Sequence, residues 1–173
     1  MRERVVPLNL GFEPETGVPA PFLIQNEDDA TLVFGAWRLE DRRVGVAVLE
    51  FTGCLIAKFG YPNDEALAGS PLERHGLVPY ATQEVLDSSW VRSLEAQNRI
   101  AFPKSHAWER RHFVITLHDS TFECLATGLA TSFAADPLPE VVERIVNVKA
   151  ASDPPLVAAA IAAARRLLGR FGR

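Results

Sequence analysis

Histidine and carboxylate side chains occur close together in residues 112 to 126, which read HFVITLHDSTFECLA. If Asp119 and Ser120 form a two-residue turn, this stretch is a β-hairpin. Glu123 then lies diagonally across the strand pair from His118, within reach of long side chains. Such a pair can act as a general base with its orienting carboxylate, or supply two ligands of a metal site. We therefore take His118 and Glu123 as candidate catalytic residues.

The predicted hairpin has two faces, because paired residues of an antiparallel hairpin project to the same side of the sheet and successive pairs alternate between the two sides. One face is apolar and should belong to the core; it holds Phe113, Ile115, Leu117, Phe122, Cys124 and Ala126. The other face is polar and holds His112, Thr116, His118, Thr121 and Glu123. Polar residues of this kind are also typical of a half-exposed structural face, so both interpretations of His118 and Glu123 stay open.

Other signatures of chemistry are weak. His112 and His118 would be separated by about 20 Å along the hairpin and cannot share one metal ion. Neither Ser120 nor Cys124 lies in a recognised nucleophile motif. The chain has no phosphate-binding glycine loop, so no cofactor is predicted. Cys54 and Cys124 fall in apolar strand patterns without metal-ligand spacing, so no metal site is predicted.

Length and composition favour one soluble domain over residues 1–173. Of the residues, 47% are hydrophobic and 23% are charged, which is close to the globular average. A net charge of −4 provides no basic field for nucleic acid, so we expect no nucleic-acid partner. No segment approaches the ~18 apolar residues that span a bilayer. We expect no membrane association, and the absence of a signal-like start favours a cytoplasmic location.

Strand-like segments precede helix-like segments along the chain. Strands are expected at residues 4–10, 22–24, 31–38, 44–52 and 54–59, with Gly53 as a bend in one long strand. A helix is expected from Ser88 or Ser89 to Asn98, and two more after the capping pairs Asp136-Pro137 and Asp153-Pro154, the last over residues 155 to 168. The predicted fold is α+β: a twisted antiparallel sheet of five to seven strands, which could curl into a half-barrel, with one inserted helix and two C-terminal helices packed on one face.

Residues 111 to 126, RHFVITLHDSTFECLA, together with the upstream stretch SSWVRSLE, resemble a family of small uncharacterised bacterial proteins. The resemblance covers about a quarter of the chain. That family has no known activity, so the resemblance implies only that the hairpin and the helix belong to one domain type. It assigns no catalytic residue.

Two functional classes remain after these exclusions. The first, which we favour, is a non-enzymatic module that binds a small molecule or a protein through an open sheet face. The second is a small hydrolase or acid/base enzyme that uses His118 and Glu123, with or without a metal ion. A homo-oligomer is compatible with either class.

Overall fold

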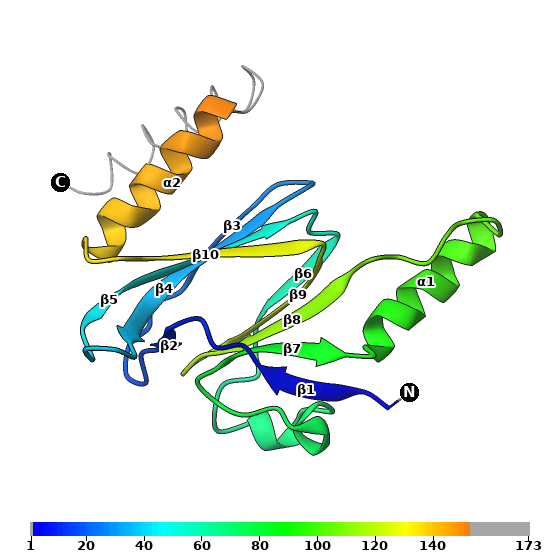
Figure 1. The fold of residues 1–173 in the computed structure, drawn as a ribbon, viewed down its shortest axis with the longest axis horizontal. Coiled ribbons are helices and arrows are strands. Elements are labelled where there is room, and N and C mark those ends of the chain that lie inside the picture. The colour runs from blue at the N-terminus through cyan, green and yellow to red at the C-terminus, as the bar shows by residue number, and fades with distance from the viewer. Residues whose placement is uncertain (1, 153–173) are drawn as a thin grey trace.

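Two antiparallel sheets form the body of the protein in a computed structural model that describes residues 2–152 (Figure 1). Sheet A has the order β1 (Arg4–Pro7), β7 (Thr82–Leu86), β8 (Arg111–Thr116), β9 (Thr121–Ala126) and β6 (Ile56–Gly60). Sheet B has the order β10 (Gly128–Ala134), β5 (Val44–Thr52), β4 (Ala30–Arg38) and β2 (Phe12–Pro14), and β3 (Phe22–Gln25) also pairs with β4. The helices are α1 (Ser89–Ala101) and α2 (Leu138–Ser152), and the short 3-10 turns are η1 (Leu67–Gly69) and η2 (Glu73–His75).

The main core lies between the two sheets and is built from alternating apolar residues of β4, β5, β8 and β9. Phe51 of sheet B is fully buried, with its ring centroid 5.4 Å from that of Phe113 and 5.2 Å from that of Phe122, both in sheet A. Tilted aromatic pairs at such distances add stability beyond the apolar area that they bury. These three rings therefore join the two sheets at their centre.

The chain passes between the two sheets three times within residues 2–152, once between β1 and β2 and twice at the neighbouring points Gly53 and Thr127. Thr127 donates hydrogen bonds from its backbone N–H and its hydroxyl to the carbonyl of Thr52, at 2.9 and 2.8 Å. Gly53 has φ +57°, and a Cβ there would lie 2.6 Å from the Thr127 hydroxyl oxygen. Gly53 is therefore the bend that its sequence context predicts, but it carries the strand out of sheet B and into sheet A.

The 112–126 hairpin has the predicted faces but not the predicted register. Ile115 pairs with Phe122 rather than Cys124, because the turn is centred on His118 and Asp119 and closes with a hydrogen bond of 2.9 Å from the Leu117 N–H to the Ser120 carbonyl. The displacement of two residues is even, so every strand side chain keeps its face. All six residues of the predicted apolar face are buried in the main core.

The predicted single sheet of five to seven strands is wrong in its layout, because the bend at Gly53 and the crossing at Thr127 split the strands into two sheets of five. The broader α+β assignment with antiparallel sheets is confirmed. The hairpin of 31–38 and 44–52 is present as β4 and β5. The segment before the inserted helix is a strand, β7, which lies between β1 and β8 in sheet A.

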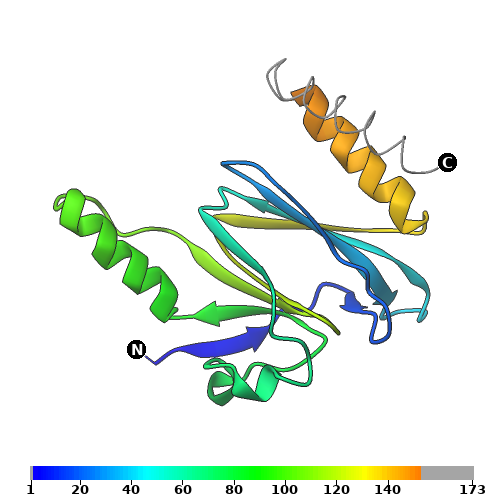
Figure 2. The same ribbon diagram turned by 180° about the vertical axis from the view of Figure 1, so that it is seen from behind.

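The two described helices differ in what they cover. α2 packs on the outer face of sheet B, where Val141 joins Val33, Val46 and Val48 in a small apolar cluster. α1 begins at Ser89, one of its two predicted starts, with Ser88 as its N-cap, but it projects away from the sheets instead of covering them (Figures 1 and 2). The second predicted C-terminal helix, at 155–168, lies outside the described residues. None of the helices within residues 2–152 is long and apolar enough to cross a membrane.

We expect Leu117→Ala to lower the free energy of unfolding by about 2–5 kcal/mol, because Leu117 is 1% exposed in the main core. Urea denaturation measures the change. Val44→Ala is the matched control at a position that is 54% exposed, and it should cost less than about 0.5 kcal/mol. A loss below about 1 kcal/mol for Leu117→Ala would show that this residue does not contribute to the core.

Candidate functional site

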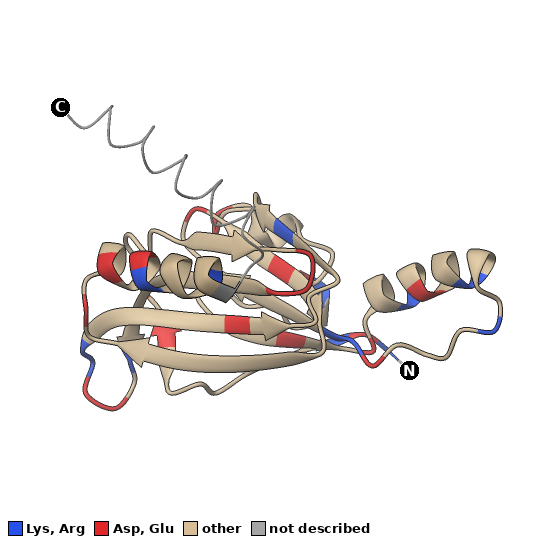
Figure 3. Ribbon diagram, turned by 90° about the horizontal axis from the view of Figure 1, so that it is seen from above, with Lys and Arg blue, Asp and Glu red and all other residues tan. Residues whose placement is uncertain are grey.

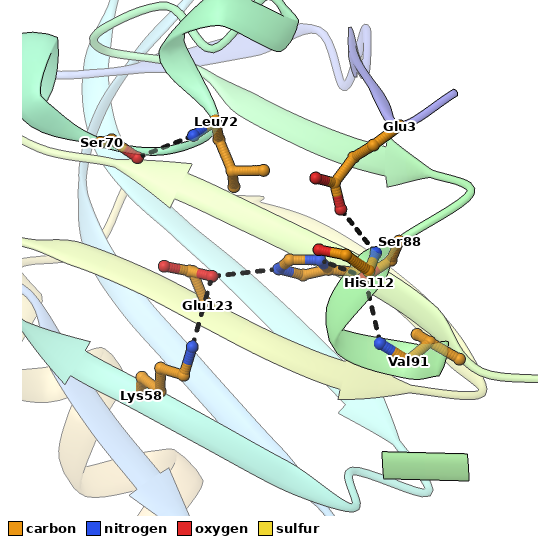
Figure 4. Close-up of polar contacts among 9 residues, drawn as sticks. Glu3, Lys58, Ser70, Leu72, Ser88, Val91, His112 and Glu123 are labelled. Atoms are coloured by element: carbon orange, nitrogen blue, oxygen red, sulfur yellow. Dashed lines mark hydrogen bonds and ion pairs between the residues drawn. The ribbon is translucent and has the colours of Figure 1, made fainter. Parts of the chain in front are cut away.

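The outer face of the 112–126 hairpin carries a chain of hydrogen bonds that runs through buried His112 (Figure 4). His112 Nε2 lies 3.1 Å from Glu123 Oε2, and His112 Nδ1 lies 2.9 Å from Ser88 Oγ. The backbone N–H of Val91 donates to the same Ser88 Oγ at 3.2 Å, as in a helix N-cap. One assignment satisfies all three contacts: Ser88 donates to Nδ1, and Nε2 carries the proton that is donated to Glu123.

Lys58 and Trp90 complete this cluster on the side of β6. The Lys58 ammonium lies 3.9 Å from Glu123 Oε2 and 3.7 Å from the centroid of the Trp90 ring, a cation–π distance. The Trp90 ring meets the His112 ring edge to face at 5.1 Å. Burial disfavours the charged form of Glu123, but the hydrogen bond with His112 and the charge of Lys58 hold the pKa of its carboxyl below the usual value.

Ser88, His112 and Glu123 have the residue types of a hydrolytic triad, but the local geometry gives Ser88 another role. Ser88 is 6% exposed, and its oxygen already accepts a backbone hydrogen bond as the cap of α1. Glu3, just before β1, also contacts the start of α1, because its carboxylate accepts the backbone N–H of Ser89 at 2.6 Å. The cluster therefore holds the start of α1 against sheet A, and we call it the anchor cluster.

A second polar cluster forms at the turn of the hairpin and consists of His118, Asp64 and Tyr80. His118 Nδ1 lies 2.9 Å from Asp64 Oδ2 and 3.1 Å from the Tyr80 hydroxyl. The Tyr80 hydroxyl also donates to Asp64 Oδ2. Asp64 belongs to the loop after β6 and Tyr80 precedes β7, so three loops meet at one end of sheet A.

Backbone contacts fix this second cluster. The Asp64 N–H donates to the His118 carbonyl at 2.9 Å, and the Thr121 hydroxyl donates to the Pro62 carbonyl at the same distance. The hydrogen bond that the Asp64 carboxylate accepts from the imidazole raises the pKa of His118, and the nearby charges of Asp64, Asp119 and Glu65 act in the same direction. The Tyr80 hydrogen bond is the main cause that lowers the pKa of Asp64. An imidazole held in this way by a carboxylate could exchange protons through Nε2.

The two candidate catalytic residues therefore occupy different clusters. His118 lies in the turn, and the register places Val114 rather than Thr116 opposite Glu123, so the diagonal neighbour that contacts Glu123 is His112. The predicted pairing of His118 with Glu123 is wrong for this reason. A catalytic role for either residue stays a prediction.

Sequence reasoning found Ser88 only as one of two expected first residues of the helix and did not find Asp64, Tyr80 or Lys58 as site residues. Tyr80 and Asp64 are 38 and 54 positions from His118 in the chain, so only the folded sheet brings them together. The one local signal was the turn-like sequence around Asn63, whose side chain accepts the N–H of Ala66 at 3.2 Å.

No three His, Cys, Asp or Glu side chains within residues 2–152 are arranged to hold a metal ion. Both cysteines of this part of the chain are free and buried, and burial raises the pKa of the Cys124 thiol far above its usual range. Comparison with protein-family models, with curated proteins and with solved structures gave no match. The interpretation of function therefore depends on the geometry alone.

We expect Asp64→Asn to lower the pKa of His118 toward its ordinary value of 6.5, because it removes the carboxylate that favours the charged imidazole. In the unmodified protein the pair contributes stability that is fully present below about pH 6.5 and is lost as pH rises through the raised pKa. NMR titration of the His118 ring measures the shift. Asp119→Asn is the control, since Asp119 lies 4.0 Å from Nε2 and should change the pKa less. An unchanged His118 pKa in Asp64→Asn would contradict the pairing.

We expect Ser88→Ala to lower the free energy of unfolding by about 0.5–2 kcal/mol, because it removes the cap of α1. Hydrogen exchange should rise most at the first amides of α1. Ser93→Ala, at an exposed position of the same helix, is the control and should change stability by less than about 0.5 kcal/mol. Equal effects of the two variants would rule out the anchoring role of Ser88.

Proposed function

We propose that this protein is a non-enzymatic protein-binding module that presents a projecting arm to an acidic partner. The arm consists of residues 88–110, which are the cap Ser88, α1 and the segment that returns from it to β8. It extends beyond the two sheets, away from α2 and from the body of the molecule (Figure 3). Two apolar side chains of the arm, Ile100 and Phe102, are largely exposed.

The exposure of α1 is the observation that carries the proposal. None of its 13 residues is buried, although Trp90, Val91 and Leu94 form an apolar stripe. Ile100 is 84% exposed and Phe102, directly after the helix, is 64% exposed. Large apolar side chains clustered on a projection are typical of an interaction site, because their exposure is unfavourable until a partner covers them.

The arm is nevertheless held in one conformation. The Glu95 carboxylate accepts the backbone N–H of Trp108, and the Asn98 amide donates to Ser105 Oγ at 3.2 Å, so the returning segment is tied to the helix. The anchor cluster fixes its start. A helix of this length is marginal in isolation. Contacts that order it in advance reduce the entropy lost when a partner binds.

A groove of about 320 Å³ at the base of the arm offers room for a partner side chain. Its apolar lining comes from both sides: Leu94 and Trp108 belong to the arm, and Leu55 and Ile56 lie at the start of β6. Leu55 is itself exposed. An apolar partner residue placed there would cover both the arm and the edge of sheet A, as anchors do at the centre of an interface.

Charge favours an acidic partner. The arm contains four basic residues and two acidic residues, so it carries a net charge of +2, whereas the rest of the chain carries −6 to give the total of −4. Such an uneven distribution steers an acidic surface toward the arm and away from the body. The proposed partner is therefore a protein with an apolar recess bordered by Asp and Glu, which receives Ile100 and Phe102.

A second candidate function rests on the cluster at the hairpin turn. His118 is oriented by Asp64 and Tyr80, as a general base is oriented by its carboxylate. The enzyme hypothesis therefore continues on His118 with Asp64, while Glu123 takes part in the anchor cluster. We place the binding module first because the groove at the base of the arm is lined by residues of the arm and of β6.

We expect the double variant Ile100→Asp and Phe102→Asp to lose its partner, because it places charge on the two most exposed apolar side chains of the arm. Immobilised protein is exposed to extract of the source organism, and a retained protein is then produced in pure form and titrated by calorimetry. Affinity should fall at least about tenfold in the double variant. It should also fall with added salt.

Val44→Asp is the matched control, since it adds a charge at an exposed apolar residue of β5 outside the arm, and it should bind as the unmodified protein does. The proposal would be overturned if no protein is retained, if the double variant retains the same partner with the same affinity, or if the retained molecule is a nucleic acid.

A further inference from the structure

A groove of about 600 Å³ lies at the end of sheet B, away from the arm and from both polar clusters. Three segments border it: the connection between β1 and β2, the end of β4 with the turn that follows, and β10. Its volume is within the range of small-molecule sites, about 300–1,000 Å³. Leu10, Phe12, Leu39 and Phe133 give it apolar walls, and the Phe12 and Phe133 ring centroids are 6.1 Å apart.

Arg38 is the one basic side chain in the lining of this groove, and its ion pair within residues 2–152 is with Asp41. Its guanidinium carbon lies 5.0 Å from the centroid of the Phe133 ring, which orients the planar group. Its Nε is buried without a hydrogen-bond partner. Asp41 is 3.6 Å away, too far for a hydrogen bond, and its carboxylate already accepts the N–H of Arg43 at 3.1 Å. An arginine with unsatisfied donors costs stability unless a ligand supplies an acceptor.

Glu40 lines the same groove and supplies the opposite charge. Its carboxylate makes no hydrogen bond or ion pair with any of residues 2–152. A phosphate dianion is disfavoured here, because it would meet a carboxylate and only one arginine. An arginine without a hydrogen bond and an exposed carboxylate without a partner, in a single apolar groove, instead match a ligand that carries both charges.

We infer that this groove binds a small zwitterion of the α-amino acid type. Its carboxylate contacts Arg38, its ammonium group contacts Glu40, and its apolar side chain lies against Phe12 and Phe133. An adjoining groove of about 310 Å³ shares Leu10, Phe12 and Leu39 with the first and continues to Thr82, whose hydroxyl oxygen is buried without a partner. The additional space accommodates a side chain as large as an aromatic ring.

The first experiment is a thermal-shift screen of the full-length protein with each of the twenty common L-amino acids at about 10 mM. At that concentration a ligand with a Kd near 1 mM already stabilises the folded state measurably. At least one apolar amino acid should raise the melting temperature of the unmodified protein. Arg42→Gln is the matched control on the same turn, outside the groove lining, and should keep the shift. Arg38→Gln should lose it.

Analogues test the same contacts on the unmodified protein, which keeps the inference testable if Arg38→Gln fails to fold. For a phenylalanine response, calorimetry would compare L-phenylalanine with 3-phenylpropionate, which lacks the ammonium group, and with L-phenylalaninamide, which lacks the carboxylate. Each should bind at least about tenfold more weakly, because each leaves one groove charge unpaired. For another amino acid, its deamino and amide forms serve in the same way.

The inference would be overturned if no amino acid shifts the melting temperature, if the amide binds as tightly as the acid, or if folded Arg38→Gln binds as the unmodified protein does. Because the groove shares no residue with the arm, loss of amino-acid binding leaves the arm's partner binding unchanged.

Discussion

The corner at Gly53 and Thr127 is the constraint on which the rest of this structure depends. Two strands that would otherwise form one long ribbon, 44–60 and 121–134, bend there together, so that β5 pairs with β10 in sheet B and β6 pairs with β9 in sheet A. Three residues, 53 to 55, oppose two, 126 and 127, which is the count of a bulge. A side chain at Gly53 would collide with Thr127, and one at Gly128 would meet the Thr52 hydroxyl at 2.7 Å. The close approach folds the ribbon onto itself and encloses the aromatic core.

That corner also determines which residues of the 112–126 hairpin face away from the core. With its inner face committed to the core, sheet A presents His112 and Glu123 outward, beside the start of α1. A buried imidazole needs partners for both nitrogens, and it finds Glu123 on one side and the cap Ser88 on the other. Lys58 reaches the same carboxylate from β6. The polar residues that suggest a catalytic interpretation therefore satisfy one another's hydrogen-bonding groups. Because Ser88 is also the cap of α1, these contacts fix the start of the arm.

The sequence predicted local features well because their physics is local. The alternation of apolar and polar residues assigned Ile115, Leu117, Phe122 and Cys124 to the core. The assignment is correct although the predicted register is not, because a displacement of two residues leaves each side chain on the same face of the sheet. The start of α1 was placed at Ser88 or Ser89 because Trp90, Val91 and Leu94 have helical spacing, and the structure adds that Ser88 caps the helix. The turn itself was misplaced because Asp119 suits either centre of a tight turn. The partners of His118 and the division into two sheets depend on contacts between residues more than 35 positions apart, which no local pattern encodes.

The distribution of unsatisfied polar groups separates the structural parts of this molecule from its open ones. Around His112 and around His118, donors and acceptors find partners within the described chain. Three buried side-chain atoms of residues 2–152 have no hydrogen-bond partner: the Thr31 hydroxyl in β4, and the Arg38 Nε and the Thr82 hydroxyl, whose residues border adjoining grooves. A fold tolerates such a cost where another molecule offsets it, since a buried unpaired donor is rarely retained otherwise. The histidines drew attention to polar clusters whose hydrogen bonds are made within the fold. The buried polar atoms without partners, in contrast, point to the grooves as the place where a ligand could bind.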